Sequence, residues 1–155
     1  MTERDFSSQG KKNRAAGRRF EAKVRDDLEK MGWIVDKWTN TVDYDRDGNI
    51  GKVVPAKRKY NPYMKVMVIG TGFPDFIAFK NIKEEEIFNE IGEKINSPEG
   101  KFDIIGVEVK ANGYLDKIEK GMCTWLLENK VFSRILIAKK GKKRGEIVYT
   151  EFEIP

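Results

Sequence analysis

The sequence predicts a single α/β domain in which a mixed sheet is flanked by helices, and three observations support this fold class. Apolar residues recur every three or four positions over about residues 13–31, which predicts an amphipathic helix. Two segments rich in Val, Ile and Phe, at 70–79 and 104–110, are bounded by turn residues and predict short buried strands. A strand–helix–strand pattern across 102–138 predicts a right-handed crossover between parallel strands.

Length and composition are those of a folded domain. The chain has 155 residues, of which 39% are hydrophobic, so one domain with a substantial core is expected. Residues 1–12 are polar and predict a disordered basic arm, which leaves 13–155 as the domain. No apolar run approaches the roughly 20 residues of a membrane span. We therefore expect a soluble, intracellular (cytoplasmic) protein.

Charge and residue usage restrict the chemistry. The net charge of +5, with Lys and Arg in clusters, favours a polyanionic partner. A single Cys excludes an internal disulfide and a Cys-based zinc site. Because the chain has no His, the commonest general base and metal ligand is missing. Any hydrolysis must therefore use carboxylates, Lys and a metal ion.

The first helix is expected from about Asn13 to Met31, with Gly32 as its stop signal. Its predicted core face consists of Ala16, Phe20, Val24, Leu28 and Met31. Arg14, Arg18 and Arg19 lie at the start of this helix. They are candidates for steering a nucleic-acid backbone, and the alternative is that they form the polar face of the helix.

Residues 33–69 predict β-hairpin material, with a strand at 33–38 and shorter ones at 53–54 and 67–69. The segment 43–50 resembles the first half of a calcium-binding EF-hand loop. Val54 stands where that loop needs a bidentate Glu, so a turn with Asp47-Gly48 at its tip is the favoured interpretation.

Two further segments lie on either side of the predicted strand at 70–79. One is basic and aromatic, which favours contact with a phosphate backbone and an exposed base, the alternative being a solvated loop. Its candidate binding residues are Lys57, Arg58, Lys59 and Tyr60. Residues 81–101 form an acidic insertion with an expected short helix at 84–95, whose Glu residues face solvent.

The C-terminal part should contain a helix over about 114–129, a buried strand at 134–138 and a closing strand at 146–152. The apolar stripe of that helix is interpreted as core packing. It consists of Leu115, Ile118, Met122, Trp125 and Leu126. The basic turn 139–145 is either solubilising or a source of phosphate contacts.

Charged residues interrupt the two motif strands. Asp75 opens the first strand, whereas Glu108 and Lys110 lie in the second and share one face because strand side chains alternate. Buried carboxylates are costly unless they are paired or hold a cation. A metal site is therefore predicted here, and the alternative is a simple salt bridge at the ends of exposed strands.

Pro74-Asp75 followed by Glu108-Val109-Lys110 resembles the signature of the PD-(D/E)XK nuclease superfamily. Within it, the chain is most similar to archaeal Holliday junction resolvases and related small stand-alone nucleases, over roughly residues 14–140. The resemblance implies a restriction-endonuclease-like αβββαβ core, here with an extra hairpin region and a short helical insertion. It also implies an archaeal or viral source.

The resemblance further implies a site. Asp75, Glu108 and the Val109 carbonyl would hold Mg²⁺, with Mn²⁺ able to substitute. Lys110 would orient or deprotonate the attacking water, and both roles are open. Glu21 matches a Glu that the family often carries on its first helix, although it could be a solvated surface charge.

The helix after the second motif strand lacks the Gln found there in many related nucleases. Lys117 and Lys120 are the candidates for contacting nucleic acid in its place, with Asn112 as another, while Glu119 and Lys120 could also be the solvated face of the helix.

The expected function is that of a Mg²⁺-dependent deoxyribonuclease, an endonuclease that cuts DNA, with branched, Holliday-junction-like structures among its substrates. The alternatives are a non-catalytic nucleic-acid-binding module and a subunit of a recombination or restriction complex. A homodimer is expected by resemblance, because paired cuts in a four-way junction need two sites. DNA against RNA, branched against linear substrate, sequence preference and one metal against two stay open.

Overall fold

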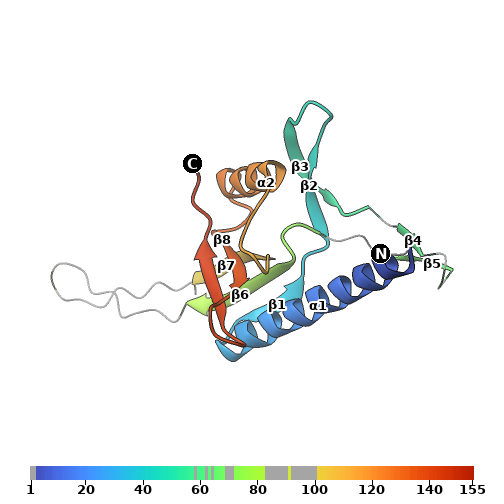
Figure 1. The fold of residues 1–155 in the computed structure, drawn as a ribbon. Helices are drawn as coiled ribbons and strands as arrows, with labels where there is room; N and C mark the ends of the chain where they lie inside the picture. The colour runs from blue at the N-terminus through green and yellow to red at the C-terminus, as the bar shows by residue number, and fades with distance from the viewer. Residues whose placement is uncertain are drawn as a thin grey trace.

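The computed structural model describes residues 3–57, 59–61, 63, 65–68, 72–82, 91 and 101–155. These residues form two helices and nine strands, shown in Figure 1. In chain order the elements are α1 (Glu3–Lys30), β1 (Ile34–Lys37), β2 (Asn40–Tyr44), β3 (Ile50–Pro55), β4 (Lys59–Asn61), β5 (Val66–Val68), β6 (Phe76–Ile82), β7 (Lys101–Val109), α2 (Lys117–Glu128), β8 (Arg134–Lys140) and β9 (Ile147–Glu151).

The centre of the molecule is a mixed five-stranded sheet in the order β1-β6-β7-β8-β9. β7 and β8 run parallel and are joined by α2, whereas the other neighbours are antiparallel. α1 covers one face of the sheet and α2 the other (Figure 1). The predicted α/β class, the mixed sheet and the parallel crossover are confirmed.

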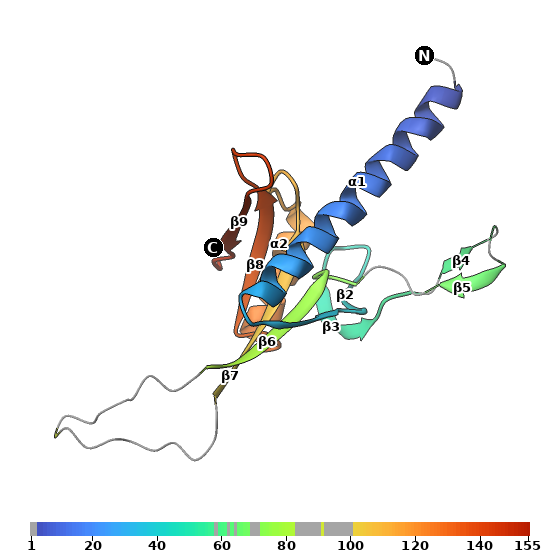
Figure 2. The same cartoon turned by 90° about the horizontal axis from the view of Figure 1, so that it is seen from below.

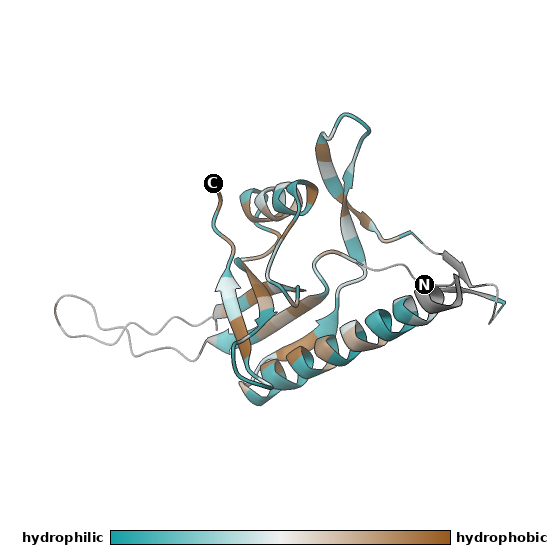
Figure 3. Ribbon diagram, in the orientation of Figure 1, coloured by the Kyte–Doolittle hydropathy of each residue, from teal (hydrophilic) through white to brown (hydrophobic). Residues whose placement is uncertain are grey.

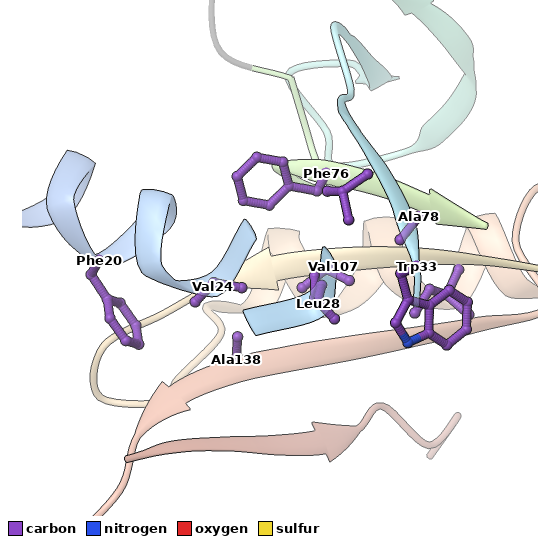
Figure 4. Packing of buried hydrophobic residues seen from close by; sticks show 10 residues of the cluster. Phe20, Val24, Leu28, Trp33, Phe76, Ala78, Val107 and Ala138 are labelled. Atoms are coloured by element: carbon purple, nitrogen blue, oxygen red, sulfur yellow. The ribbon is translucent and has the colours of Figure 1, made fainter. Parts of the chain in front are cut away.

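The core on the α1 side is formed where the helix crosses the sheet. Phe20, Val24 and Leu28 pack against Ala78 of β6 and Val107 of β7 (Figure 4). Val24 and Leu28 are fully buried, and burying each such side chain stabilises the fold by about 1.5–3 kcal/mol. This packing places α1 beside the ends of the two motif strands.

The core on the α2 side has a different composition. Met122, Cys123 and Leu126 of α2 pack against Ile135 and Ile137 of β8. Ile118, which we expected in this core, is 42% exposed, because α2 turns that side chain away from the sheet. Trp125 and Leu115 are partly buried at the edge of the cluster.

The first helix is longer than predicted. It begins at Glu3 rather than near Asn13, so residues 3–12 are helical where we expected a disordered arm. Side-chain pairing one turn apart supports this extension, since Gln9 Nε2 donates to Asn13 Oδ1 at 3.0 Å. The extension carries few apolar residues, which is why the sequence pattern did not indicate it.

The N-terminal half of α1 projects beyond the sheet, as Figure 2 shows. Hydrophilic residues dominate its surface (Figure 3). Ala16 is consequently exposed, and at the other end Met31 is 49% exposed, so both were wrongly assigned to the core. The residues of α1 that are buried against the sheet are Phe20, Val24 and Leu28.

The hairpin material of residues 40–55 forms a separate antiparallel pair, β2–β3. Its tip is the predicted turn: the Gly48 N–H donates to the Asp45 carbonyl at 3.1 Å, with φ of +82° at Gly48. Asp45 Oδ1 also accepts from the N–H groups of Asp47 and Asn49. Because these bonds use the carboxylate locally, the turn interpretation holds. β4 and β5 form a second small pair, of which β4 was not predicted.

Two predictions concern the insertion and the membrane. The expected helix at 84–95 falls, apart from Ile91, outside the described residues. In the part of the chain that the structure describes, no helix combines the length and apolar character needed to cross a bilayer.

Candidate active site

The site lies where β6 begins and β7 ends. The register pairs Phe76 with Val107, so Asp75 and Glu108 are the next residues on two neighbouring antiparallel strands. Gly106 permits the close approach of the chain before β6, because a Cβ there would lie 2.7 Å from Pro74 Cγ. The predicted juxtaposition of the two motifs is therefore a property of the strand register.

Each of the two carboxylates accepts a hydrogen bond from the backbone of the opposite segment. The Asp75 N–H donates to Glu108 Oε2 at 3.1 Å, and the Val109 N–H donates to Asp75 Oδ2 at 2.8 Å. The Asp75 carbonyl accepts from the Trp38 N–H at 3.0 Å, which ties the site to the segment after β1. Asp75 and Glu108 are thus held at one point with little freedom.

Both carboxyl groups of this pair have a raised pKa. Burial raises the pKa of Glu108 to about 9, and the neighbouring charge of Asp75 adds to the rise. Burial also raises the pKa of Asp75 to about 6, with a further contribution from the charge of Glu21. Glu108 is 5% exposed and is the buried charged residue among those that the structure describes. In the metal-free chain the pair therefore retains a proton at neutral pH.

Lys110 directly follows β7 and faces the same point. Its Nζ lies 3.5 Å from Glu108 Oε1 and donates to Glu119 Oε1 at 2.5 Å. Burial would lower the pKa of Lys110, but the hydrogen bond to Glu119 and the charge of Glu108 outweigh it and raise that pKa. Lys110 is therefore an ammonium in this arrangement, which favours positioning and charge stabilisation over proton abstraction.

Glu119 was missed as a site residue and assigned to the solvated face of its helix. Its side chain is 17% exposed and reaches Lys110, while Glu119 Oε2 accepts from the Asp116 N–H at 2.9 Å. Asp116 Oδ1 in turn accepts from the Glu119 N–H, which completes a capping box at the start of α2. The Asp-x-x-Glu pattern of residues 116–119 was the signal that could have fixed this helix start, three residues after the predicted Tyr114.

Glu21 lies close enough to Asp75 for its charge to raise the pKa of that carboxyl. Glu21 is half-buried and lines a cavity of about 290 Å³ together with Val109 and Phe20. The structure thus brings Glu21 to the border of the site, on the helix where it was predicted.

The predicted nucleic-acid-binding residues are more dispersed. Arg14, Arg18 and Arg19 are exposed on α1, and Lys117 and Lys120 are exposed on the first turns of α2. All five side chains are available to a partner, and Lys120 lies one residue beyond the Glu119 that contacts Lys110.

The basic–aromatic segment lies away from the central sheet. Lys57 is exposed, and Lys59 and Tyr60 are residues of β4. Arg58 lies outside the described residues. Asn112 is exposed, and its Oδ1 accepts from the Tyr114 N–H at 3.0 Å, so it serves the local turn.

The donor set can be compared with the needs of a divalent cation. Within the described ranges, no group of three or more His, Cys, Asp or Glu side chains converges as a metal cluster. Two carboxylates do converge, and their raised pKa values mark an excess of negative charge that a cation would offset. Mg²⁺ commonly binds through one or two carboxylates while keeping several waters, so the residues present fit that ion.

Comparison of the chain with protein-family models, with curated proteins and with solved structures gives no match. The site itself must therefore carry any inference about function.

Proposed function

We propose that the chain is a Mg²⁺-dependent nuclease that hydrolyses phosphodiester bonds in DNA. The observation that carries this proposal is the convergence of the half-buried Asp75 and the buried Glu108 with the Lys110 ammonium at the ends of two adjacent strands. Three titratable groups crowded at one partly buried point are costly for folding, so a role in chemistry accounts for them better than a role in stability.

Asp75, Glu108 and the Val109 carbonyl would hold the metal ion. When bound, Mg²⁺ activates a water and neutralises charge on the phosphate. Without a cation, two carboxylates would repel an incoming phosphate, so we propose that activity depends strictly on metal and that Mn²⁺ can replace Mg²⁺.

The ammonium of Lys110 supplies the complementary charge. Held between Glu108 and Glu119, it is oriented to donate a hydrogen bond to a phosphate oxygen or to the attacking water. Glu21, at the border of the site, can orient a water on the α1 side. Glu119 positions Lys110 and need not touch the substrate.

The order α1, β1, β6, β7, α2, β8 supports a restriction-endonuclease-like core as the finer description of the fold. We also propose that the chain is a member of the PD-(D/E)XK superfamily. By that membership it would act on branched DNA, as a homodimer, inside the cell. The exposed cations on α1 and α2 support DNA as the partner, because phosphate contacts supply most non-specific affinity.

A cleavage assay tests the proposal. Labelled linear, flap and four-way-junction DNA, with matching linear RNA, would be incubated with Mg²⁺, Mn²⁺ or EDTA. We expect metal-dependent cutting that falls by roughly 100-fold or more in Asp75→Asn and in Lys110→Met. Asp36→Asn, which removes an exposed carboxylate from the neighbouring β1, is the matched control and should cut as the wild type does.

Binding of DNA without cutting under any metal would refute the nuclease proposal and leave a nucleic-acid-binding module. Cutting that appears only after a partner protein is added would identify a subunit of a larger complex. Cutting that survives Asp75→Asn would show that the site has been assigned to the wrong residues.

A further inference from the structure

A second charged region lies next to the candidate active site. The turn between β8 and β9 closes over α1 and encloses a groove of about 440 Å³, which we call the basic groove. Phe20 forms part of its lining, and Glu146 is its acidic member. The cationic side chains that line it are Lys23, Lys140, Lys142, Lys143 and Arg144.

Carboxylate partners are lacking for these five cations in the part of the chain that the structure describes. None of them forms an ion pair within 4.0 Å among the residues that the structure describes, in contrast to Lys110 and Arg134. The one carboxylate in the groove is used by the turn, since Glu146 Oε2 accepts from the Lys143 N–H at 3.1 Å. The groove therefore carries five cationic side chains against the single carboxylate of Glu146.

The turn that carries three of these cations is held in place. The Gly141 N–H donates to the Glu146 carbonyl at 2.8 Å, and the Glu146 N–H donates to the Lys143 carbonyl at 3.1 Å. Lys140 is placed over the ring of Phe20, with its Nζ 5.4 Å from the ring centroid. The cations are thus mounted on an ordered hairpin and a helix, not on a free tail.

The basic groove shares lining residues with the cavity that borders the candidate active site. The 290 Å³ cavity beside the site shares Phe20 and Lys140 with the groove, and Glu21 and Val109 line its other side. A strand of phosphates in the groove could therefore follow α1 to the cavity that Glu21 and Val109 line.

We infer that the basic groove binds the backbone phosphates of a nucleic-acid strand that passes the border of the candidate active site at Glu21 and Val109. This inference rests on the proposed function for the path of the strand, although the binding itself needs no catalysis. Phosphate contacts carry no base information, so DNA and RNA strands both fit the chemistry and the test separates them.

Binding in EDTA tests the groove without any cutting. Fluorescence anisotropy of labelled single-stranded DNA and RNA would be followed from about 50 to 200 mM salt, where each lost phosphate contact reduces the slope of log K by about 0.7. Lys142→Gln/Lys143→Gln/Arg144→Gln should reduce the slope by about 2 and weaken binding. The matched control Lys30→Gln/Lys52→Gln/Lys130→Gln removes the same charge from exposed positions outside the groove and should change it little.

A comparison on α1 separates a groove from a solvated basic turn. Lys23 lines the groove from the α1 side. Lys30, the last residue of α1, lies outside the groove in an exposed ion pair with Asp26. Lys23→Gln should reduce the slope by about 0.7, and Lys30→Gln should leave it unchanged. Equal slopes for both variants and the wild type would overturn the groove.

The outcomes distinguish this inference from the proposed function. Metal-dependent cutting with unchanged binding by the triple groove variant would overturn the groove and leave the nuclease standing. Loss of binding in that variant, together with no cutting by the wild type, would support the groove and refute the nuclease. A wild type that binds neither strand would overturn the inference outright.

Discussion

Glu108→Gln should make the stability of the metal-free protein less dependent on pH. Glu108 is 5% exposed, and its pKa is raised to about 9 from an ordinary value of 4.5. Between these two values the folded chain holds a proton that the unfolded chain has released. Stability therefore falls as pH rises, because the folded state binds more protons.

The magnitude follows from the linkage relation. One group protonated only in the folded state lowers the free energy of unfolding by about 1.4 kcal/mol per pH unit. From pH 4.5 to neutrality this amounts to about 3 kcal/mol for Glu108, an upper value because the pair shares its proton with Asp75. Asp75 acts in the same direction at lower pH, since its pKa is raised to about 6.

The assay is urea denaturation followed by Trp fluorescence in EDTA, from about pH 5 to pH 9. The wild type should lose stability steadily across this range, Glu108→Gln should lose much less, and millimolar Mg²⁺ should restore wild-type stability at high pH. Glu128→Gln, at an exposed position of α2, is the matched control and should keep the wild-type slope. A wild-type stability that is flat or rises from neutral pH to about pH 9 would refute the reasoning.

Three further predictions concern the surroundings of the site. Glu119→Gln, which keeps the helix cap but not the charge beside Lys110, should cost about 1 kcal/mol in urea denaturation, and Glu119→Ala about 2 kcal/mol because the bond from the Asp116 N–H to the Glu119 side chain is lost as well. Gly106→Ala should lower stability in thermal denaturation by about 1–3 kcal/mol, because its Cβ would lie 2.7 Å from Pro74 Cγ. Cys123 is fully buried and its pKa is raised to about 12 by burial and by the charges of Glu108 and Glu119, so an aromatic disulfide reagent should react with it only as fast as the protein opens.

Each of these predictions has a contrary outcome. Wild-type stability for Glu119→Gln would show that the charge of Glu119 beside Lys110 contributes nothing. Equal losses of stability in both Glu119 variants would show that the bond from the Asp116 N–H to the Glu119 side chain contributes nothing. Unchanged melting of Gly106→Ala would mean that the chain before β6 can shift without cost. Rapid labelling of Cys123 in the native protein would show that the core under α2 is open to solvent.

The sequence was most informative where periodicity and chemistry coincide. Phe20, Val24 and Leu28 follow a helical period, and alternation along one strand placed Glu108 and Lys110 together, as their 3.5 Å contact confirms. That Asp75 meets Glu108 depends on strand order, which apolar character alone does not indicate; the pairing of the two motifs was expected from the family resemblance, and the register of β6 and β7 brings them together.

Other features could not be predicted because they arise only from tertiary packing. The basic groove joins Lys23 to the turn at 142–144, and nothing local in either segment indicates the other. The early start of α1 at Glu3 lacks an apolar stripe, so hydrophobic periodicity could not detect it. The position of Glu119 could have been predicted, because its capping pattern with Asp116 is present in the sequence. We instead considered Glu119 as part of the solvated face of the helix.

The projection of α1 beyond the sheet has a consequence for how the molecule opens. Between Phe20 and Leu28 the helix can unfold only when the core does, so its amides should exchange with deuterium at the rate of global opening. Towards Gln9 the same helix has only its own hydrogen bonds, and its amides should exchange faster by several orders of magnitude. Arg14, Arg18 and Arg19 lie on this transition, and a bound polyanion would be registered there as newly slowed exchange.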